Sequence, residues 1–258
     1  MKDAEENLKK AQREGAVEDQ EKALEKLRQA KAELEEILRQ LREEEIRRML
    51  AILEARFKKM LELQRQVYDG TVRVDQVPKA QRSHSHEIEA SRLSSKEMEI
   101  VMEADKALAL LHEDGTAVAF TEATSQVRED MEQVVGRLAQ VMVGQTTQDI
   151  ELDIIAALEE MIEALQKEIK KMDDKKSPPG NPPPGQPQDP PLVDLLAEMK
   201  MIRALQMRVN RRTQRYSKLV EADKSTENAE LKEALRRLAD REQRIHKITR
   251  DIETGRNR

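Results

Sequence analysis

The sequence contains no cysteine and no tryptophan, and aromatic residues make up only 2% of its 258 residues. Without cysteine, disulfide frameworks, thiol nucleophiles and cysteine-ligated metal sites are excluded. The scarcity of aromatic rings argues against a thick globular core, because such cores depend on bulky side chains. The apolar residues that are present are mainly Leu, Ile, Val, Ala and Met, which suit the narrow seams between packed helices.

Long apolar runs are also missing. The start of the chain is charged, with Lys2, Asp3, Glu5 and Glu6 directly after Met1, so it does not resemble a signal peptide. No stretch approaches the ~20 apolar residues that a membrane-spanning helix requires. We therefore expect no membrane insertion and a cytoplasmic location, with the cell envelope as the alternative if an export signal precedes this sequence.

The motifs of common catalytic and binding sites are absent as well. Gly136 and Gly144 are isolated, so there is no glycine-rich phosphate loop, and His112 lacks a second His four residues later. His84 and His86 are separated by one residue and are expected to lie in a solvated loop. We predict a non-enzymatic protein with no catalytic, cofactor-binding or metal site and no small-molecule substrate.

What the sequence does contain is helical heptad patterning. One seam, called here the 24–41 seam, alternates three- and four-residue steps and consists of Leu24, Leu27, Lys31, Leu34, Leu38 and Leu41. It then shifts by one residue and continues through Ile46, Leu50, Leu53, Phe57, Met60, Gln64 and Val67. Such a shift changes the local supercoiling of a coiled coil. The pattern predicts one long helix.

A second seam, called here the 155–172 seam, has the cleanest heptad pattern of the chain. Its members are Ile155, Leu158, Ile162, Leu165, Ile169 and Met172. Ile at one heptad position and Leu or Met at the other favours a parallel two-stranded coiled coil. The short turns at Asp114-Gly115 and Gly144-Gln145 favour antiparallel neighbours within one chain instead. We predict that this seam is an interaction surface and leave the helix direction open.

These patterns predict an all-α fold of elongated helices in coiled-coil or hairpin packing, joined by a proline-rich linker. The expected segments are a long N-terminal helix (1–70), a connector (71–93), a helical hairpin (94–176), a Pro/Gly-rich linker (177–191) and a basic helical pair (192–258). The linker holds eight of the nine prolines, which cannot continue a helix.

Local signals suggest where these helices begin and end. Asp69-Gly70 is expected to end the first helix, because these residues tolerate left-handed backbone geometry. Ser94 and Glu97 have the spacing of a capping box and predict a helix start. Asp189 followed by Pro190 predicts the start of the helix after the linker.

Charge is distributed unevenly along the chain. Residues 192–258 contain 17 Lys/Arg against 11 Asp/Glu, whereas the remainder contains 29 against 40. The densest group, called here the 203–218 basic run, consists of Arg203, Arg208, Arg211, Arg212, Arg215 and Lys218. These side chains suit either the binding of a polyanion, such as nucleic acid or an acidic envelope polymer, or ion pairs with the acidic helices upstream.

Two blocks of sequence support a resemblance to a known family. They are Leu192 to Tyr216 (LVDLLAEMKMIRALQMRVNRRTQRY) and Gln148 to Gln166 (QDIELDIIAALEEMIEALQ), separated by the proline-rich spacer. Together they resemble an uncharacterised family of long-helix proteins from planctomycete-type bacteria, and the resemblance covers most of the chain from about Ala16 to Val220. It implies helices joined by a tether, and it implies no activity.

We therefore expect a structural or adaptor coiled-coil protein that self-associates or contacts another helical protein. The alternative is a module that binds a polyanion through the 203–218 basic run.

Overall fold

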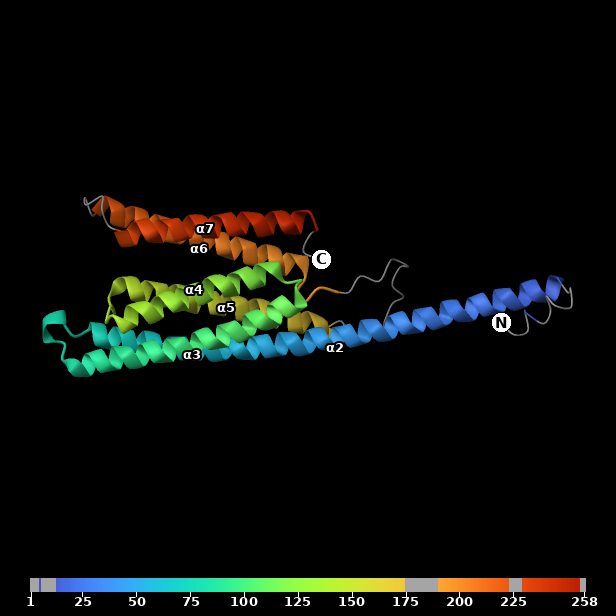
Figure 1. The fold of residues 1–258 in the computed structure, drawn as a ribbon, viewed down its shortest axis with the longest axis horizontal. Coiled ribbons are helices and arrows are strands. Elements are labelled where there is room, and N and C mark those ends of the chain that lie inside the picture. Colours follow the sequence, from blue (N-terminus) through green and yellow to red (C-terminus); the bar gives the residue numbers. More distant parts are fainter. Residues whose placement is uncertain (1–4, 6–12, 175–189, 223–228, 256–258) are drawn as a thin grey trace. The chain divides into compact units, whose positions relative to one another are not determined.

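The computed structural model describes Glu5 and residues 13–174, 190–222 and 229–255. These residues form helices joined by turns and short connectors, and none of them forms a strand, which confirms the all-α class (Figure 1). Most of the expected linker, up to residue 189, lies outside the described residues. The described residues divide into two compact units, the first with residues 13–47 and the second with residues 48–174, 191–222 and 229–255.

The helices are α2 (Arg13–Asp75), α3 (His84–Asp114), α4 (Val118–Ala139), α5 (Gln145–Asp174), α6 (Leu195–Ala222) and α7 (Ala229–Glu253), with a 3-10 turn at Lys79–Gln81. Within the second unit, α4 contacts α3, α5, α6 and α7. Residues 48–75 of α2 join this bundle through buried hydrogen bonds to α3 and α5. Short turns connect α3, α4 and α5, which lie alongside one another (Figure 1).

The core of the bundle follows the helical periodicity of the sequence. In α2 the predicted positions Leu50, Leu53, Phe57 and Met60 are fully buried. Apolar residues three and four positions apart lie on one face of a helix, so this stripe faces the interior of the bundle while the charged residues between them stay outside. Phe120 of α4 is also fully buried.

The predicted end of the first helix at Asp69-Gly70 is wrong, because α2 continues to Asp75. Glycine in a helix interior costs about 1 kcal/mol relative to alanine, which made an end plausible there. A Cβ on Gly70 would lie 2.5 Å from Leu93 Cδ2, so the glycine lets α2 and α3 approach closely. Beyond it, Thr71 and Val74 are buried, so the last turns of α2 pack within the bundle.

The predicted helix start at Ser94 and Glu97 is also wrong. The structure begins α3 at His84, where Ser83 and His86 form the capping box. The predicted pair lies in the helix interior, where Ser94 Oγ donates a hydrogen bond to the carbonyl of Val135 at 2.9 Å. Ser94 and Glu97 therefore have the spacing of a capping box but take part in contacts between helices and do not begin a helix.

The helix after the linker begins at Leu195, later than the Asp189-Pro190 signal predicted. Asp194 takes the capping role, since its Oδ1 accepts a hydrogen bond from the backbone N–H of Ala197 at 2.7 Å. Pro190 is described and is not helical, and Asp189 lies outside the described residues.

Candidate functional site

The 24–41 seam lies exposed along the first unit. Its five leucines are between 50% and 57% exposed, as are its apolar neighbours Val17 and Ile37. The helix around them is supported by ion pairs between residues three and four apart, among them Lys22–Glu18 and Arg39–Glu36. Such pairs add only a few tenths of a kcal/mol each. The seam is therefore an apolar stripe on a helix that draws its stability from local interactions.

The 155–172 seam has a different environment, because α5 packs inside the bundle. Leu158, Ile162 and Leu165 are buried, whereas Ile155, Ile169 and Met172 are half-buried. The buried stripe also includes residues outside the heptad positions, namely Ile150, Ile154, Ala157 and Met161. A stripe this wide fits a helix that contacts several neighbours of one bundle, and α5 contacts α4 and α6.

The 203–218 basic run is divided between buried and exposed positions on α6. Arg212 binds both carboxylate oxygens of Asp130 at 2.8 and 2.6 Å and reaches Asp153 at 2.7 Å. Arg208 donates to Glu160 at 3.0 Å. These contacts place the two arginines against acidic residues of α4 and α5, and both are nearly fully buried.

The other members of the run lie further out. Arg211 is 3.9 Å from Glu160, and Arg215 lies between Asp149 at 3.5 Å and Asp153 at 3.4 Å. Arg203 and Lys218 are exposed. The run is therefore no continuous basic surface, since α5 supplies acids to several of its members.

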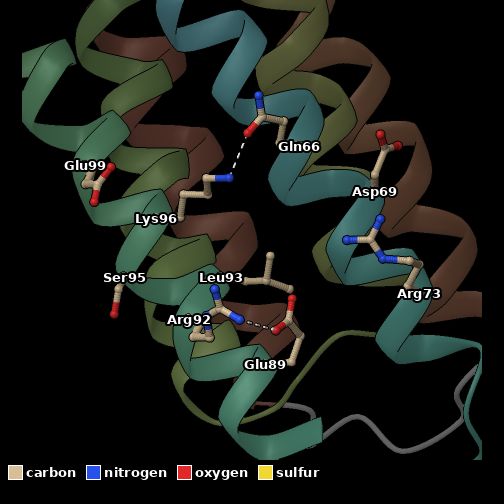
Figure 2. A pocket seen from close by; sticks show the side chains of 9 residues that line it. All are labelled: Gln66, Asp69, Arg73, Glu89, Arg92, Leu93, Ser95, Lys96 and Glu99. Atoms are coloured by element: carbon tan, nitrogen blue, oxygen red, sulfur yellow. Dashed lines mark hydrogen bonds and ion pairs between the residues drawn. The ribbon is translucent and has the colours of Figure 1, made fainter.

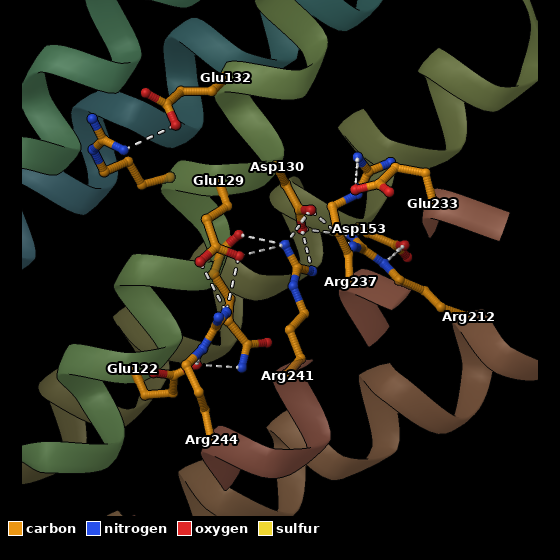
Figure 3. Close-up of polar contacts among 12 residues, drawn as sticks. Glu122, Glu129, Asp130, Glu132, Asp153, Arg212, Glu233, Arg237, Arg241 and Arg244 are labelled. Carbon is orange, nitrogen blue, oxygen red and sulfur yellow. Dashed lines mark hydrogen bonds and ion pairs between the residues drawn. The ribbon is translucent and has the colours of Figure 1, made fainter. Parts of the chain in front are cut away.

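Asp130 is the centre of an ion-pair network that sequence reasoning missed. Arg241 of α7 donates to its two carboxylate oxygens at 2.7 and 3.2 Å and also reaches Glu129 (Figure 3). Arg244 extends the network to Glu129 at 2.8 Å and to Glu122 at 2.7 Å. The network joins α6 and α7 to α4. The excess of basic residues in the C-terminal segment was the available signal.

The electrostatics of this network favour its charged form. Burial alone would raise the pKa of Asp130, but the guanidinium groups of Arg212 and Arg241 outweigh it and hold that pKa well below its usual range. Burial likewise opposes the charge on Arg212, yet Asp130 and Asp153 raise its pKa. Paired charges of this kind are costly to separate, because each lost partner leaves a buried charge uncompensated.

A second buried polar group lies between α2, α3 and α5. Gln64 Nε2 donates to Glu97 at 3.0 Å, and Thr71 Oγ1 donates to Glu151 at 2.7 Å. Burial raises the pKa of Glu97 well above its usual value, with a further contribution from Glu151. Burial also raises the pKa of Glu151 to about 7. Glu97 and Glu151 each lie at helical spacing from the buried residues of their own helix. An analysis that follows apolar residues alone does not detect them.

One further buried acid has a structural role. Glu198 of α6 accepts a hydrogen bond from the backbone N–H of Ala119 at 2.7 Å, in the first turn of α4. It therefore caps α4 from another helix, where the free N–H groups favour a carboxylate. Burial nevertheless raises its pKa to about 7.

A polar groove of about 550 Å³ lies between α2 and α3 (Figure 2). Lys96 donates to Gln66 at 2.7 Å across it, and Arg92 approaches Glu89 at 3.4 Å. Its charged lining residues are Asp69, Arg73, Glu89, Arg92, Lys96 and Glu99. Acidic and basic groups are balanced, so the groove has no preference for a ligand of one charge.

Among the described residues, no group of three or more His, Asp or Glu side chains is placed to hold a metal ion. None of the described helices combines the length and apolar character that crossing a bilayer requires.

Comparison with protein-family models, curated proteins and solved structures found no match to this chain. The resemblance to the planctomycete-type family therefore stays a prediction.

Proposed function

We propose that this protein is a non-enzymatic structural or adaptor protein that self-associates through the 24–41 seam of α2. The observation that carries the proposal is the exposure of five regularly spaced leucines on a helix whose other residues are mostly charged or small. In this reading the helical bundle of the second unit is a folded body, and the N-terminal part of α2 is the element that joins copies.

The proposal rests on the energetics of an isolated helix. Helices gain most of their stability from packing an apolar face, and local ion pairs substitute for that only weakly. Burying ten half-exposed leucines in a dimer would stabilise it by on the order of 10 kcal/mol. That gain is similar to the estimated ~4–15 kcal/mol lost as two molecules become one. We therefore expect an association that depends on protein concentration.

The 155–172 seam is a weaker candidate for contact between molecules. Leu158 and Leu165 are fully buried within their own chain. Their association with another copy would require the bundle to open, with the loss of its core contacts. This comparison favours the 24–41 seam as the surface for self-association.

Binding of a polyanion remains the alternative. Arg203, Arg211 and Lys218 are exposed and suit phosphate contacts, but Arg208 and Arg212 are engaged with Glu160 and Asp130. Polyanion affinity grows with the number of phosphates that are neutralised. The run offers too few exposed cations for this function to be the favoured one.

The test is the mass of the full chain in solution by light scattering, over a concentration series at low and high salt. The proposal predicts a dimer or larger species that resists salt, because apolar contacts are not screened. Leu27→Lys with Leu34→Lys should yield a monomer with unchanged bundle stability. Leu195→Lys with Leu196→Lys, at similarly exposed positions on α6, is the matched control and should remain associated. A wild-type monomer throughout the series contradicts the proposal.

A further inference from the structure

The residues that flank the 24–41 seam differ on its two sides. One flank, immediately after the second core position of each heptad, carries charges of alternating sign at Glu21, Arg28, Glu35 and Arg42. The other flank, immediately before the first core position, carries Ala23, Ala30 and Ile37. Flanking residues of a coiled coil meet across the interface and set the direction of the chains. The two flanks therefore discriminate between parallel and antiparallel pairing.

Parallel pairing is poorly supported by this sequence. In a parallel dimer the two different flanks face one another, so Arg28 and Glu35 would each meet an alanine and form no ion pair across the interface. Each core position would face its own copy. Lys31 would then oppose Lys31 of the second copy inside the seam, where two like charges repel.

Antiparallel pairing brings the charged flank against itself. When Leu24 faces Leu41 of the second copy and Leu27 faces its Leu38, Arg28 lies opposite Glu35, and the same pair forms again by symmetry. The outer residues Glu21 and Arg42 would also lie opposite one another, although Arg42 already donates to Glu45 at 2.9 Å in its own helix. The inner pairs therefore carry the argument.

Antiparallel pairing also determines what Lys31, the polar residue of the seam, lies against. Lys31 lies opposite Leu34 of the second copy rather than opposite another lysine. Its ammonium group is 3.5 Å from Glu35 in the same helix, at the edge of the seam. A lysine can cover apolar surface with its methylene groups while its charge stays in water. Antiparallel pairing thus accommodates the one polar interruption of the seam.

The alternation of charge also selects one register. A shift by one heptad in either direction brings like charges together, Arg28 against Arg28 and Glu21 against Glu35 in one case, Glu35 against Glu35 and Arg28 against Arg42 in the other. Like charges directly opposed across a helical interface are destabilising. Only the unshifted register pairs every charge of this flank with its opposite.

We propose that the occupant of the 24–41 seam is a second copy of this chain, bound antiparallel in the register that pairs Arg28 with Glu35. This proposal rests on the self-association proposed above and adds the direction and register of the two helices. On the other flank Ala30 lies opposite Ile37 of the second copy, and the small alanine permits close approach of the backbones.

Charge reversal tests the pairing. Arg28→Glu alone and Glu35→Arg alone should each weaken dimerisation by about 10- to 30-fold, because each replaces two attractive pairs with two repulsive ones. The double variant Arg28→Glu/Glu35→Arg should restore the wild-type dissociation constant. Lys26→Glu/Glu33→Arg changes charges on the side of the helix away from the seam and is the control. If the single reversals leave a wild-type dimer unchanged, the proposed register is contradicted while self-association still stands.

Distances between spin labels test the direction independently. The absence of native cysteine permits single labels at Lys22→Cys or Gln29→Cys, which share one outer face of the helix. At 1.5 Å per residue, antiparallel pairing separates the two labels of a dimer along the axis by about 32 Å at position 22 and about 11 Å at position 29. Parallel pairing gives equal distances at both positions. Equal distances overturn the proposal, and the absence of any dimer overturns the proposed function as well.

Discussion

Two seams with the same heptad spacing have opposite environments in this protein. Leu34 in the 24–41 seam is 57% exposed, whereas Leu158 in the 155–172 seam is fully buried by its own chain. The spacing of the leucines does not distinguish the two cases. The residues between them do, because α5 is also apolar at Ile150 and Ala157, outside its heptad positions, whereas α2 carries Lys26 and Glu33 at the equivalent places.

The width of the apolar stripe therefore indicates where the contact partner of a helix lies. A helix that contacts several neighbours within one bundle needs a wide stripe, whereas a helix that pairs with one other helix needs only a narrow one. A narrow seam such as the 24–41 seam remains available for contact with another molecule.

Loss of the network centre should have the largest effect, and it should affect the bundle alone. We expect Asp130→Asn to lower the free energy of unfolding by about 3–5 kcal/mol, because Arg212 and Arg241 lose their shared buried counter-charge. Urea denaturation measures the change. Asp105→Asn, which disrupts the exposed pair with Arg128, should cost less than about 1 kcal/mol. Equal effects of the two variants would contradict the central role of Asp130.

Shortening one leucine in each seam tests the comparison directly. Leu158→Ala should lower the free energy of unfolding by about 2–5 kcal/mol, because it leaves a cavity in the bundle, and should leave the dimer dissociation constant unchanged. Leu34→Ala should do the reverse, with weaker dimerisation and an unchanged bundle. Urea denaturation and sedimentation equilibrium, run on both variants, separate the two effects. A loss of bundle stability in Leu34→Ala would show that the seam is part of the bundle.

The buried acids should make bundle stability depend on pH. Burial raises the pKa of Glu151 from 4.5 to about 7, so between these values the folded state binds more protons than the unfolded state. Stability therefore falls as pH rises from about 5 to 8. We expect Glu151→Gln to be up to about 3 kcal/mol more stable than wild type at pH 8, and similar to it near pH 5.

Urea denaturation across this pH range provides the measurement. Glu159→Gln, at an exposed position of the same helix, is the control and should follow the wild-type profile. The dimer dissociation constant should show no matching change, since Glu97 and Glu151 lie in the bundle. A wild-type profile in Glu151→Gln would refute the assignment of the pH dependence to this acid.

Replacing either of two glycines within helices by alanine should have the smallest effects on the melting temperature, and the two effects should have opposite signs. Gly70→Ala should lower the melting temperature by a few degrees, because its Cβ would lie 2.5 Å from Leu93 and about 1 kcal/mol of helix propensity does not offset that contact. Gly136→Ala, with no atom within 4 Å of its Cβ, should raise the melting temperature instead. Thermal unfolding followed by circular dichroism decides, and a higher melting temperature for Gly70→Ala would contradict the close contact of α2 and α3.

The sequence was sufficient to predict the all-α class, because helical periodicity extends over most of the chain. It was insufficient at Gly70 and Ser94, which have the local signals of a helix end and a helix start. Both residues instead lie within helices, at contacts with a helix that is distant in sequence. It also missed Asp130, Glu97 and Glu151, since the burial of an acid depends on which helices surround it. The sequence indicates the burial of these three acids only through their positions on otherwise apolar helix faces.

The most direct test of the central claim is sedimentation equilibrium of the full chain beside its Leu27→Lys/Leu34→Lys variant, each followed by urea denaturation. The account predicts a wild-type dimer, a monomeric variant and the same unfolding midpoint for the bundle in both. A variant that still forms dimers, or that loses the stability of its bundle, would contradict the claim that the 24–41 seam joins copies of this protein.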